Sequence, residues 1–299
     1  MGAVERLGAL LPKAAAKLLD GHGDDVAQVR LRADRPVQVD YARGGGALSD
    51  APLARESMNR ILAALMEYSV YARQDELDRG FFTLDDGSRM GVCGSMVGEG
   101  PRLRLDGVGS ACLRVARSVK GCADALLGHI APAGSPLRST LLLSPPGLGK
   151  TTMLRDVARR LSEGGWCVGI ADERHELAAC RLGVPTLDVG PRTDVVDGCG
   201  RDRAISMLLR GFAPGVIVAD EIGGEADARA LADAARCGAA VMASAHGGSL
   251  EDALSRPMLR TVLAAGVVDV VALLGPRPGM VRGVWHRTGG EGVSAWRRA

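Results

Sequence analysis

The sequence predicts an α/β protein with two domains: a small α+β domain over residues 1–110, and a domain with a mainly parallel sheet over residues 111–299. Three observations lead to this prediction. From about residue 140, apolar strand-like segments alternate with helix-like segments, which is typical of a parallel sheet covered by helices. A glycine-rich loop separates the first of these strands from the first helix. Before residue 110 no such alternation occurs, and a hairpin signal, Asp85-Asp86-Gly87, joins two short strands.

In the N-terminal domain, leucine and alanine recur at helical spacing from Leu7 to Leu19, and Gly21 can end that helix. A second helix is expected from about Arg55 to Tyr68. The predicted strands are Val26–Leu31, Pro36–Tyr41, Phe81–Leu84 and Arg89–Gly94, and a further strand at Ser110–Arg117 is expected where the second domain begins. No catalytic cluster is evident in this domain.

In the second domain, a short helix at Cys122–Ile130 and a Pro-, Gly- and Ser-rich segment precede the alternating core. The predicted core strands are Thr140–Leu143, Cys167–Ala171, Val216–Ala219, Ala239–Ser244, Val267–Leu273 and Met280–Trp285. The predicted core helices are Lys150–Ser162, Arg201–Arg210, Ala226–Arg236 and Leu250–Leu263.

The loop after the first core strand has the features of a P-loop, because an apolar strand leads into it and a helix begins directly after it. Gly147 and Gly149 let backbone N–H groups curl around phosphate oxygens, and the helix N-terminus adds a partial positive charge. Lys150 is predicted to pair with the β- and γ-phosphates of ATP, and Thr151 to offer its hydroxyl to Mg²⁺. The predicted nucleotide-binding residues are Ser144, Pro145, Pro146, Gly147, Leu148, Gly149, Lys150, Thr151 and Thr152.

One position departs from the pattern G-x-x-x-x-G-K-[ST], since Ser144 stands where the first glycine is usual. Serine is compatible with that position if its backbone is not left-handed. The competing interpretation is a chance Gly-Lys-Thr at a turn, which the strand and helix on either side disfavour.

Two carboxylates end the apolar strand Val216–Ala219, and parallel strands deliver their C-terminal residues to the edge where the P-loop lies. We expect Asp220 to hold Mg²⁺, together with Thr151, and Glu221 to orient or deprotonate the attacking water. A solvated acidic pair at a strand end is the alternative.

Two more strand ends should reach the same edge. The segment Asp172–Glu176 supplies Glu173 and Glu176, which are either catalytic or engaged in structural ion pairs. His246 follows another strand, where it either contacts the γ-phosphate and relays its loss, or is structural.

Arg192 lies between these strands in sequence and is a candidate to stabilise transition-state charge on the γ-phosphate of a neighbouring subunit. An ion pair with Asp194 or Asp197 is an equally open interpretation.

Composition excludes several classes of protein. The formal net charge is only +2 and aromatic residues make up 3%, so stacking platforms for single-stranded nucleic acid are poorly supplied, and nucleic acid is not expected as a partner. Seven cysteines without a Cys-x-x-Cys pair argue against a disulfide framework or a zinc site and suggest a reducing cytosol. The start of the chain lacks signal-peptide features, and no apolar run reaches about 18 residues, so we expect a soluble or peripheral protein.

Taken together and in this order, these motifs resemble the stage III sporulation protein AA family, within the RecA-like type II/type IV secretion ATPases. The residues that carry the resemblance are Ser144–Asp156, Asp172–Leu177, Gly190–Val195, Asp197–Cys199, Asp220–Gly223 and Ala243–Gly247, and in the N-terminal half Val29–Arg32, Arg35–Pro36, Tyr68–Ala72 and Gly80–Thr83. The resemblance spans nearly the whole chain, and members commonly carry serine at the position of Ser144.

The resemblance implies a RecA-like core in which Asp172–Glu176 is the aspartate box, Asp220-Glu221 the Walker B motif and His246 the histidine box. It further implies a homo-hexameric ring that hydrolyses ATP and powers a secretion-like channel between mother cell and forespore. Such an ATPase would lie in the mother-cell cytoplasm against membrane channel proteins. Two departures from the family pattern are His175, where serine is usual, and Gly200-Arg201, where a Pro-Lys pair is usual.

Two alternatives belong to other classes. A nucleic-acid-associated P-loop ATPase would use the basic C-terminal tail, with five arginines and one glutamate over residues 276–299, and Arg30, Arg32 and Arg35. A channel adaptor would bind nucleotide without turnover.

Overall fold

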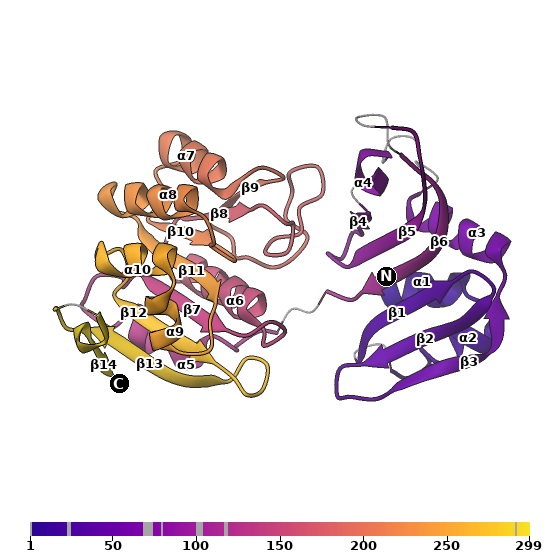
Figure 1. Cartoon of the computed structure of the whole chain (residues 1–299), viewed down its shortest axis with the longest axis horizontal. Coiled ribbons are helices and arrows are strands. Elements are labelled where there is room, and N and C mark those ends of the chain that lie inside the picture. Colours follow the sequence, from indigo (N-terminus) through magenta and orange to yellow (C-terminus); the bar gives the residue numbers. More distant parts are fainter. Residues whose placement is uncertain are drawn as a thin grey trace. The chain divides into compact units, whose positions relative to one another are not determined.

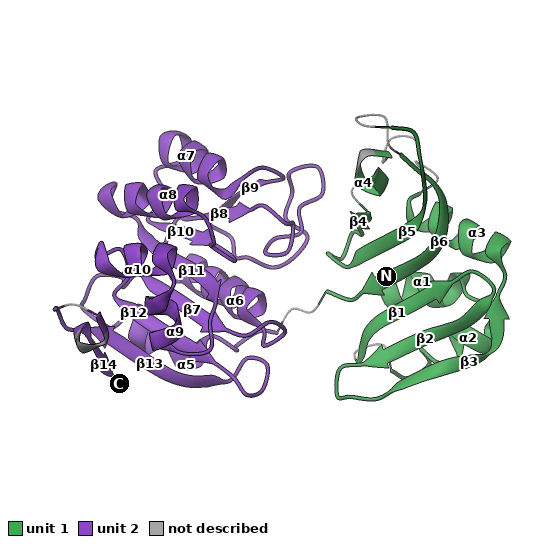
Figure 2. Ribbon diagram, in the orientation of Figure 1, with its two compact units in different colours: residues 1–116 green, residues 117–299 purple. Residues whose placement is uncertain are grey.

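The computed structural model describes residues 2–22, 25–67, 74–78, 80–99, 104–116, 119–290 and 292–299. The chain divides into two compact units, residues 1–116 and residues 117–299 (Figure 2).

Unit 1 contains a six-stranded antiparallel sheet in the order β3-β2-β1-β6-β5-β4 (Figure 1). Its strands are β1 (Val26–Arg32), β2 (Arg35–Tyr41), β3 (Gly46–Leu53), β4 (Phe81–Thr83), β5 (Arg89–Val97) and β6 (Arg104–Arg114). Its helices are α1 (Ala3–Leu10), α2 (Lys13–Ala16), α3 (Arg55–Leu65) and α4 (Gln74–Asp78).

Strand β1 shows why this sheet has one buried face. Val29 and Leu31 are fully buried, while Arg30 and Arg32 alternate with them and are part-exposed, as the period of two in a strand requires. The buried face packs against apolar residues of α1 and α3, such as Leu7. The core of unit 1 therefore lies between the sheet and these helices.

Unit 2 contains an eight-stranded sheet in the order β14-β13-β12-β7-β11-β10-β8-β9. Its strands are β7 (Thr140–Ser144), β8 (Val168–Asp172), β9 (Thr193–Asp197), β10 (Val216–Ala219), β11 (Ala240–His246), β12 (Val270–Leu274), β13 (Val281–Arg287) and β14 (Trp296–Arg298). Its helices are α5 (Asp124–Ile130), α6 (Lys150–Glu163), α7 (Arg201–Gly211), α8 (Glu225–Arg236), α9 (Leu250–Ser255) and α10 (Pro257–Ala264).

Six neighbouring strands of this sheet, from β12 to β9, are parallel, and β13 and β14 add an antiparallel edge. The sheet is buried on both faces: Leu126 of α5 and Leu154 of α6 belong to one apolar cluster, and Leu208 of α7 and Leu231 of α8 belong to the other. Helices on both faces explain why the central strands read as continuous apolar runs, and the expected α/β fold with a mainly parallel sheet is confirmed.

Several elements differ from the sequence prediction. The strand expected at Ser110–Arg117 is the end of β6, which pairs with β1 and β5, so unit 1 continues to Ala116. Pro12 splits the first predicted helix and Pro257 the last one, because proline cannot continue a helix that precedes it. Strands β3 and β9 were not predicted, since both are edge strands whose residues are mostly part-exposed and lack an apolar run.

Within the described residues, no helix is long and apolar enough to cross a membrane.

Candidate nucleotide site

The predicted phosphate loop lies between the end of β7 and the start of α6. Gly147 has φ +79° and Gly149 has φ +84°, a left-handed conformation that favours glycine. A Cβ at Gly147 would meet no atom within 4 Å, so the loop is open to a ligand on that side. Ser144 is not left-handed but ends strand β7 opposite His246, which meets the condition under which serine fits this position.

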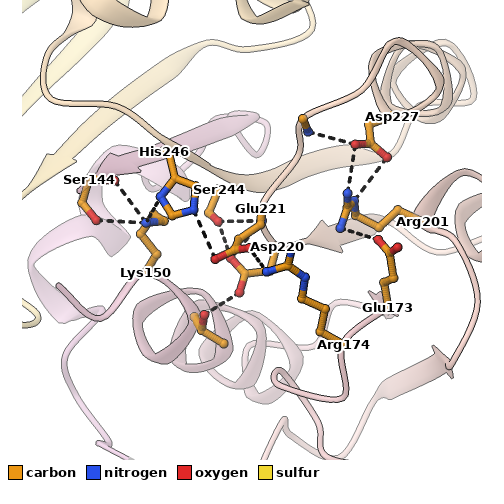
Figure 3. A network of polar contacts seen from close by, with 12 residues as sticks. Ser144, Lys150, Glu173, Arg174, Arg201, Asp220, Glu221, Asp227, Ser244 and His246 are labelled. Carbon is orange, nitrogen blue, oxygen red and sulfur yellow. Dashed lines mark hydrogen bonds and ion pairs between the residues drawn. The ribbon is translucent and has the colours of Figure 1, made fainter. Parts of the chain in front are cut away.

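Lys150 begins α6, and its ammonium reaches back over the loop. Its Nζ atom donates to the backbone oxygens of Ser144 at 3.1 Å and Pro145 at 3.3 Å, and lies 3.2 Å from Nδ1 of His246 (Figure 3). Burial lowers the pKa of Lys150, and the nearby charges of Asp220 and Glu221 oppose that shift. The ammonium of Lys150 is thus held by neutral acceptors of the loop and of β11, which a phosphate group can replace.

The carboxylate of Asp220 lies directly beside the start of α6. Thr151 donates its hydroxyl to Oδ2 of Asp220 at 2.5 Å, and Ser244 of β11 donates its hydroxyl to Oδ1. Strand order explains the convergence, because β10, β11 and β7 are consecutive neighbours and end at the same edge.

Glu221 adopts a left-handed backbone with φ +52°, which is uncommon for a residue other than glycine and is found at sites where the surroundings fix the backbone. Its amide donates to Oγ of Ser244 at 2.9 Å. Its carboxylate pairs with Arg174 on one oxygen, and its other oxygen lies 3.4 Å from Nε2 of His246. A continuous chain of polar contacts therefore runs from Lys150 through His246 and Glu221 to Arg174 (Figure 3).

The segment after β8 is built around the buried carboxylate of Asp172. Its two oxygens accept the amides of Glu176 at 2.9 Å, Leu177 at 3.2 Å and Ala178 at 2.8 Å, so Asp172 fixes the loop. Arg155 of α6 holds the same loop by donating to the backbone oxygens of Glu176 and Leu177. Burial lowers the pKa of Arg155, while Asp172 is the largest opposing charge.

The two candidate glutamates of this segment line a pocket at the strand ends. The Nη1 atom of Arg201 lies 2.5 Å from Oε2 of Glu173, so the two side chains form an ion pair. The pocket is lined by Ala171, Asp172, Glu173, Arg174, Glu176, Arg201, Asp220 and Glu221. The structure thus brings Glu173, Glu176, Asp220 and Glu221 together, with Glu173 in the ion pair that the sequence left open as an alternative.

Arg192 lies apart from this group. It precedes β9, its side chain is exposed, and it forms no ion pair with Asp194 or Asp197 among the described residues. Asp197 pairs instead with Nδ1 of His175 at 2.9 Å. Arg192 is exposed, and its side chain has no ion-pair partner in the part of the chain that the structure describes.

Four residues of the site were not predicted: Ser244, Arg155, Arg201 and Asp227. The sequence offers an indication for Ser244, because it is a polar residue inside the apolar run of β11. Arg155 and Arg201 sit on helices where an arginine usually points to solvent, so nothing in the sequence alone marked them as site residues.

The donor set fits a magnesium ion. Thr151 and Asp220 present a hydroxyl and a carboxylate oxygen at hydrogen-bond distance from each other, and Mg²⁺ prefers oxygen ligands together with water and substrate phosphates. No group of three or more His, Cys, Asp or Glu side chains among the described residues forms a metal cage.

Comparison with known proteins connects this site to a family. A model of the family described as sporulation stage III, protein AA matches residues 5–291. The chain belongs to this family. The stage III sporulation protein AA of Bacillus subtilis (strain 168) is 34% identical over 273 residues, which cover 89% of this chain and 88% of that protein. These findings confirm the resemblance drawn from the motifs; its segment Tyr68–Ala72 lies outside the described residues.

Other relatives are more distant. The protein SEEDLING PLASTID DEVELOPMENT 1 of Arabidopsis thaliana is 26% identical to this stage III AA family member over 268 residues, covering 87% of this chain and 36% of that protein.

Two solved structures share the fold. The Legionella pneumophila ATPase DotB superposes with a TM-score of 0.56 and 15% identity, covering 83% of this chain and 72% of that one. The pilus retraction motor PilT, solved with ADP, superposes with a TM-score of 0.59 and 16% identity, covering 91% of this chain and 78% of that one. This chain therefore shares the fold of the DotB and PilT structures, as the family resemblance implied.

Proposed function

We propose that this chain hydrolyses ATP in a Mg²⁺-dependent reaction at the edge formed by β7, β10 and β11. The observation that supports this most is the convergence of three segments beside one glycine-rich loop: the start of α6 with Lys150 and Thr151, the residues Asp220 and Glu221 after β10, and His246 of β11. A loop of free amides with an adjacent lysine is suited to phosphate binding, and paired carboxylates beside it are suited to a metal and a water.

In this proposal each contact of Lys150 is exchanged when ATP binds. The ammonium leaves the oxygens of Ser144 and Pro145 and pairs with the β- and γ-phosphates. Thr151 and Asp220 would hold Mg²⁺, which would supply neutralisation of the charge on the phosphates. Asp220 remains fixed by Ser244 while this happens.

Glu221 is the proposed group that orients the attacking water and takes its proton. Its carboxylate must first release Arg174, a contact between an arginine that is 57% exposed and a carboxylate that is 21% exposed. Exposed ion pairs are worth about 0–1 kcal/mol, so this exchange costs little. His246 bridges Lys150 and Glu221 and is placed to respond when the γ-phosphate leaves.

Family membership supports a finer proposal: that the ATPase is the motor of a sporulation-associated, secretion-like channel between mother cell and forespore. DotB is described as an ATPase and PilT as a retraction motor, and both share this fold. We propose that the chain forms a homo-hexameric ring in the mother-cell cytoplasm against membrane channel proteins. The exposed Arg192 is our candidate to reach the nucleotide of a neighbouring subunit.

Phosphate release from ATP tests the enzymatic proposal. Lys150→Ala should abolish nucleotide binding, whereas Glu221→Gln should bind nucleotide and lose turnover, because only the water-activating step is removed. Lys17→Ala and Glu225→Gln change the same residue types at exposed positions and serve as matched controls. If the wild type binds ATP but releases no phosphate, the chain is a nucleotide-binding adaptor and not an ATPase.

The mass of the protein in solution, with and without ATP and Mg²⁺, tests the ring. Assembly to a hexamer with nucleotide is expected, and Arg192→Ala should then lower turnover in the assembled form only. A strict monomer under every condition would contradict the motor while leaving nucleotide binding intact.

A further inference from the structure

Arg201 lies outside the phosphate loop and the strand ends, yet it joins two loops of the site. It is the first residue of α7, and its side chain is only 14% exposed. Its guanidinium contacts Glu173 through Nη1 at 2.5 Å, and both oxygens of Asp227 through Nε and Nη2, at 3.2 Å each (Figure 3). A fork that engages both oxygens of a carboxylate fixes direction as well as distance.

Asp227 passes this constraint to the backbone that follows Glu221. It is a buried residue in the first turn of α8, and its Oδ2 atom accepts the amides of Gly223 at 2.9 Å and Gly224 at 3.0 Å. Between Glu221 and α8, Ile222 is fixed by its buried side chain and by its amide, which donates to the backbone oxygen of Ser244 at 2.8 Å. Gly223 and Gly224 have no side chains that could fix them by packing, so these two residues are held by their bonds to Asp227. The position of Asp227 therefore sets the path of the chain from Ile222 to α8.

The backbone at Glu221, where the loop that leads to α8 begins, is strained. Glu221 is held at φ +52° and its amide is bound by Ser244. A left-handed glutamate persists only where its surroundings hold it on both sides. Ser244 restrains one side through its bonds to the amides of Glu221 and Ile222, and the carboxylate of Asp227, with Arg201 behind it, restrains the glycines that follow.

We infer that Arg201 is a positioning residue for hydrolysis: through Asp227 it fixes the loop that aims Glu221, and through Glu173 it ties that loop to the segment after β8. This inference rests on the proposed ATPase activity of the same site. Arg201 touches neither the phosphate loop nor the metal-binding pair, so its removal should leave nucleotide affinity unchanged and lower turnover.

The charge of Asp227 gives the arrangement a pH signature. Burial tends to raise the pKa of Asp227, but the hydrogen bonds from Arg201 and from the two glycine amides outweigh burial and hold its pKa below the usual value. Without Arg201 the carboxylate becomes protonated at a higher pH, and a protonated Asp227 holds the glycine amides more weakly. In a variant that lacks the guanidinium of Arg201, the loss of turnover on lowering the pH should therefore begin at a higher pH.

Arg201→Gln in the full-length chain tests this inference, with Arg203→Gln as the matched control because Arg203 lies exposed on the same helix. We expect kcat to fall about 10- to 100-fold in Arg201→Gln, with the Kd for ADP changed less than about twofold, since small misplacements of a catalytic group cost that much. Arg201→Lys keeps the charge without the fork and should recover part of the turnover. If Arg201→Gln folds poorly, Arg201→Lys carries the comparison.

A readout without turnover separates this inference from the ATPase proposal. Hydrogen exchange of the amides at Gly223 and Gly224 should speed up in Arg201→Gln and stay unchanged in Arg203→Gln. A wild type without phosphate release would refute the ATPase proposal, and the exchange result would still decide whether Arg201 holds the loop. The inference would be overturned if Arg201→Gln and Arg203→Gln had the same kcat, or if the amides of Gly223 and Gly224 exchanged at the same rate in both variants.

Discussion

Replacing Ser244 with alanine should destabilise unit 2 more than a single buried hydroxyl usually does. Ser244 is fully buried, and its Oγ atom donates to the charged carboxylate of Asp220 and accepts the amide of Glu221. A hydrogen bond to a charged group contributes about 1.5–3 kcal/mol and a neutral one about 0.5–1.5 kcal/mol. The Glu221 amide keeps a second acceptor, Oδ1 of Asp220 at 3.1 Å, and Asp220 keeps Thr151, so part of the loss is recovered. We expect the free energy of unfolding to fall by about 2–3 kcal/mol.

The three tryptophans make this loss measurable in one unit. Trp166, Trp285 and Trp296 all lie in unit 2, so tryptophan fluorescence follows the unfolding of residues 117–299 even if unit 1 unfolds separately. For a domain of this size the loss corresponds to a decrease in Tm of about 4–12 °C. Ser135→Ala, at an exposed position, is the control and should leave Tm unchanged within about 1–2 °C. A Ser244→Ala protein with the control's Tm would refute the claim that this hydroxyl holds Asp220 and Glu221.

Two further predictions concern groups buried near the site. Asp172→Asn keeps the shape of the side chain but turns an amide NH₂ toward one of the three backbone amides from which Asp172 accepts hydrogen bonds. The free energy of unfolding of unit 2, followed by tryptophan fluorescence, should therefore fall by about 1–3 kcal/mol. An unchanged unfolding transition would contradict the role of Asp172 in fixing this loop. Burial raises the pKa of Cys122 to about 11 and that of Cys180 to about 12, so at pH 8 about one thiol in a thousand or fewer is ionised. A thiol reagent should therefore modify both thiols slowly at pH 8 and faster as the pH rises toward 11. The exposed cysteines for comparison are Cys93, Cys167 and Cys237. Labelling of Cys122 and Cys180 as fast as that of these three would contradict the burial.

The core of unit 2 was predictable because its strands are buried on both faces. Val216–Ala219 is apolar throughout and was predicted with its observed bounds, and Gly149-Lys150 marked the junction of loop and helix. The edge strands β3 and β9 were not predictable, since they owe their conformation to pairing with a neighbour and not to their own composition.

The candidate site was predictable where a role follows from a residue's place at a strand end. Asp220 and His246 were identified in this way, and the structure places both beside Lys150 and Thr151. Partners that arrive from helices could not be predicted in the same way. Arg201 meets Glu173 only because the first turn of α7 lies against the end of β8, and that register is a tertiary property.

A crystal structure with a nonhydrolysable ATP analogue and Mg²⁺ tests the central claim most directly. We predict that Nζ of Lys150 leaves Ser144 and His246 for the β- and γ-phosphates, and that the metal binds Oγ1 of Thr151 at about 2.1 Å with Asp220 in its coordination sphere directly or through water. Lys150 still bound to its loop carbonyls beside an occupied nucleotide, or a metal away from Thr151 and Asp220, would contradict the account.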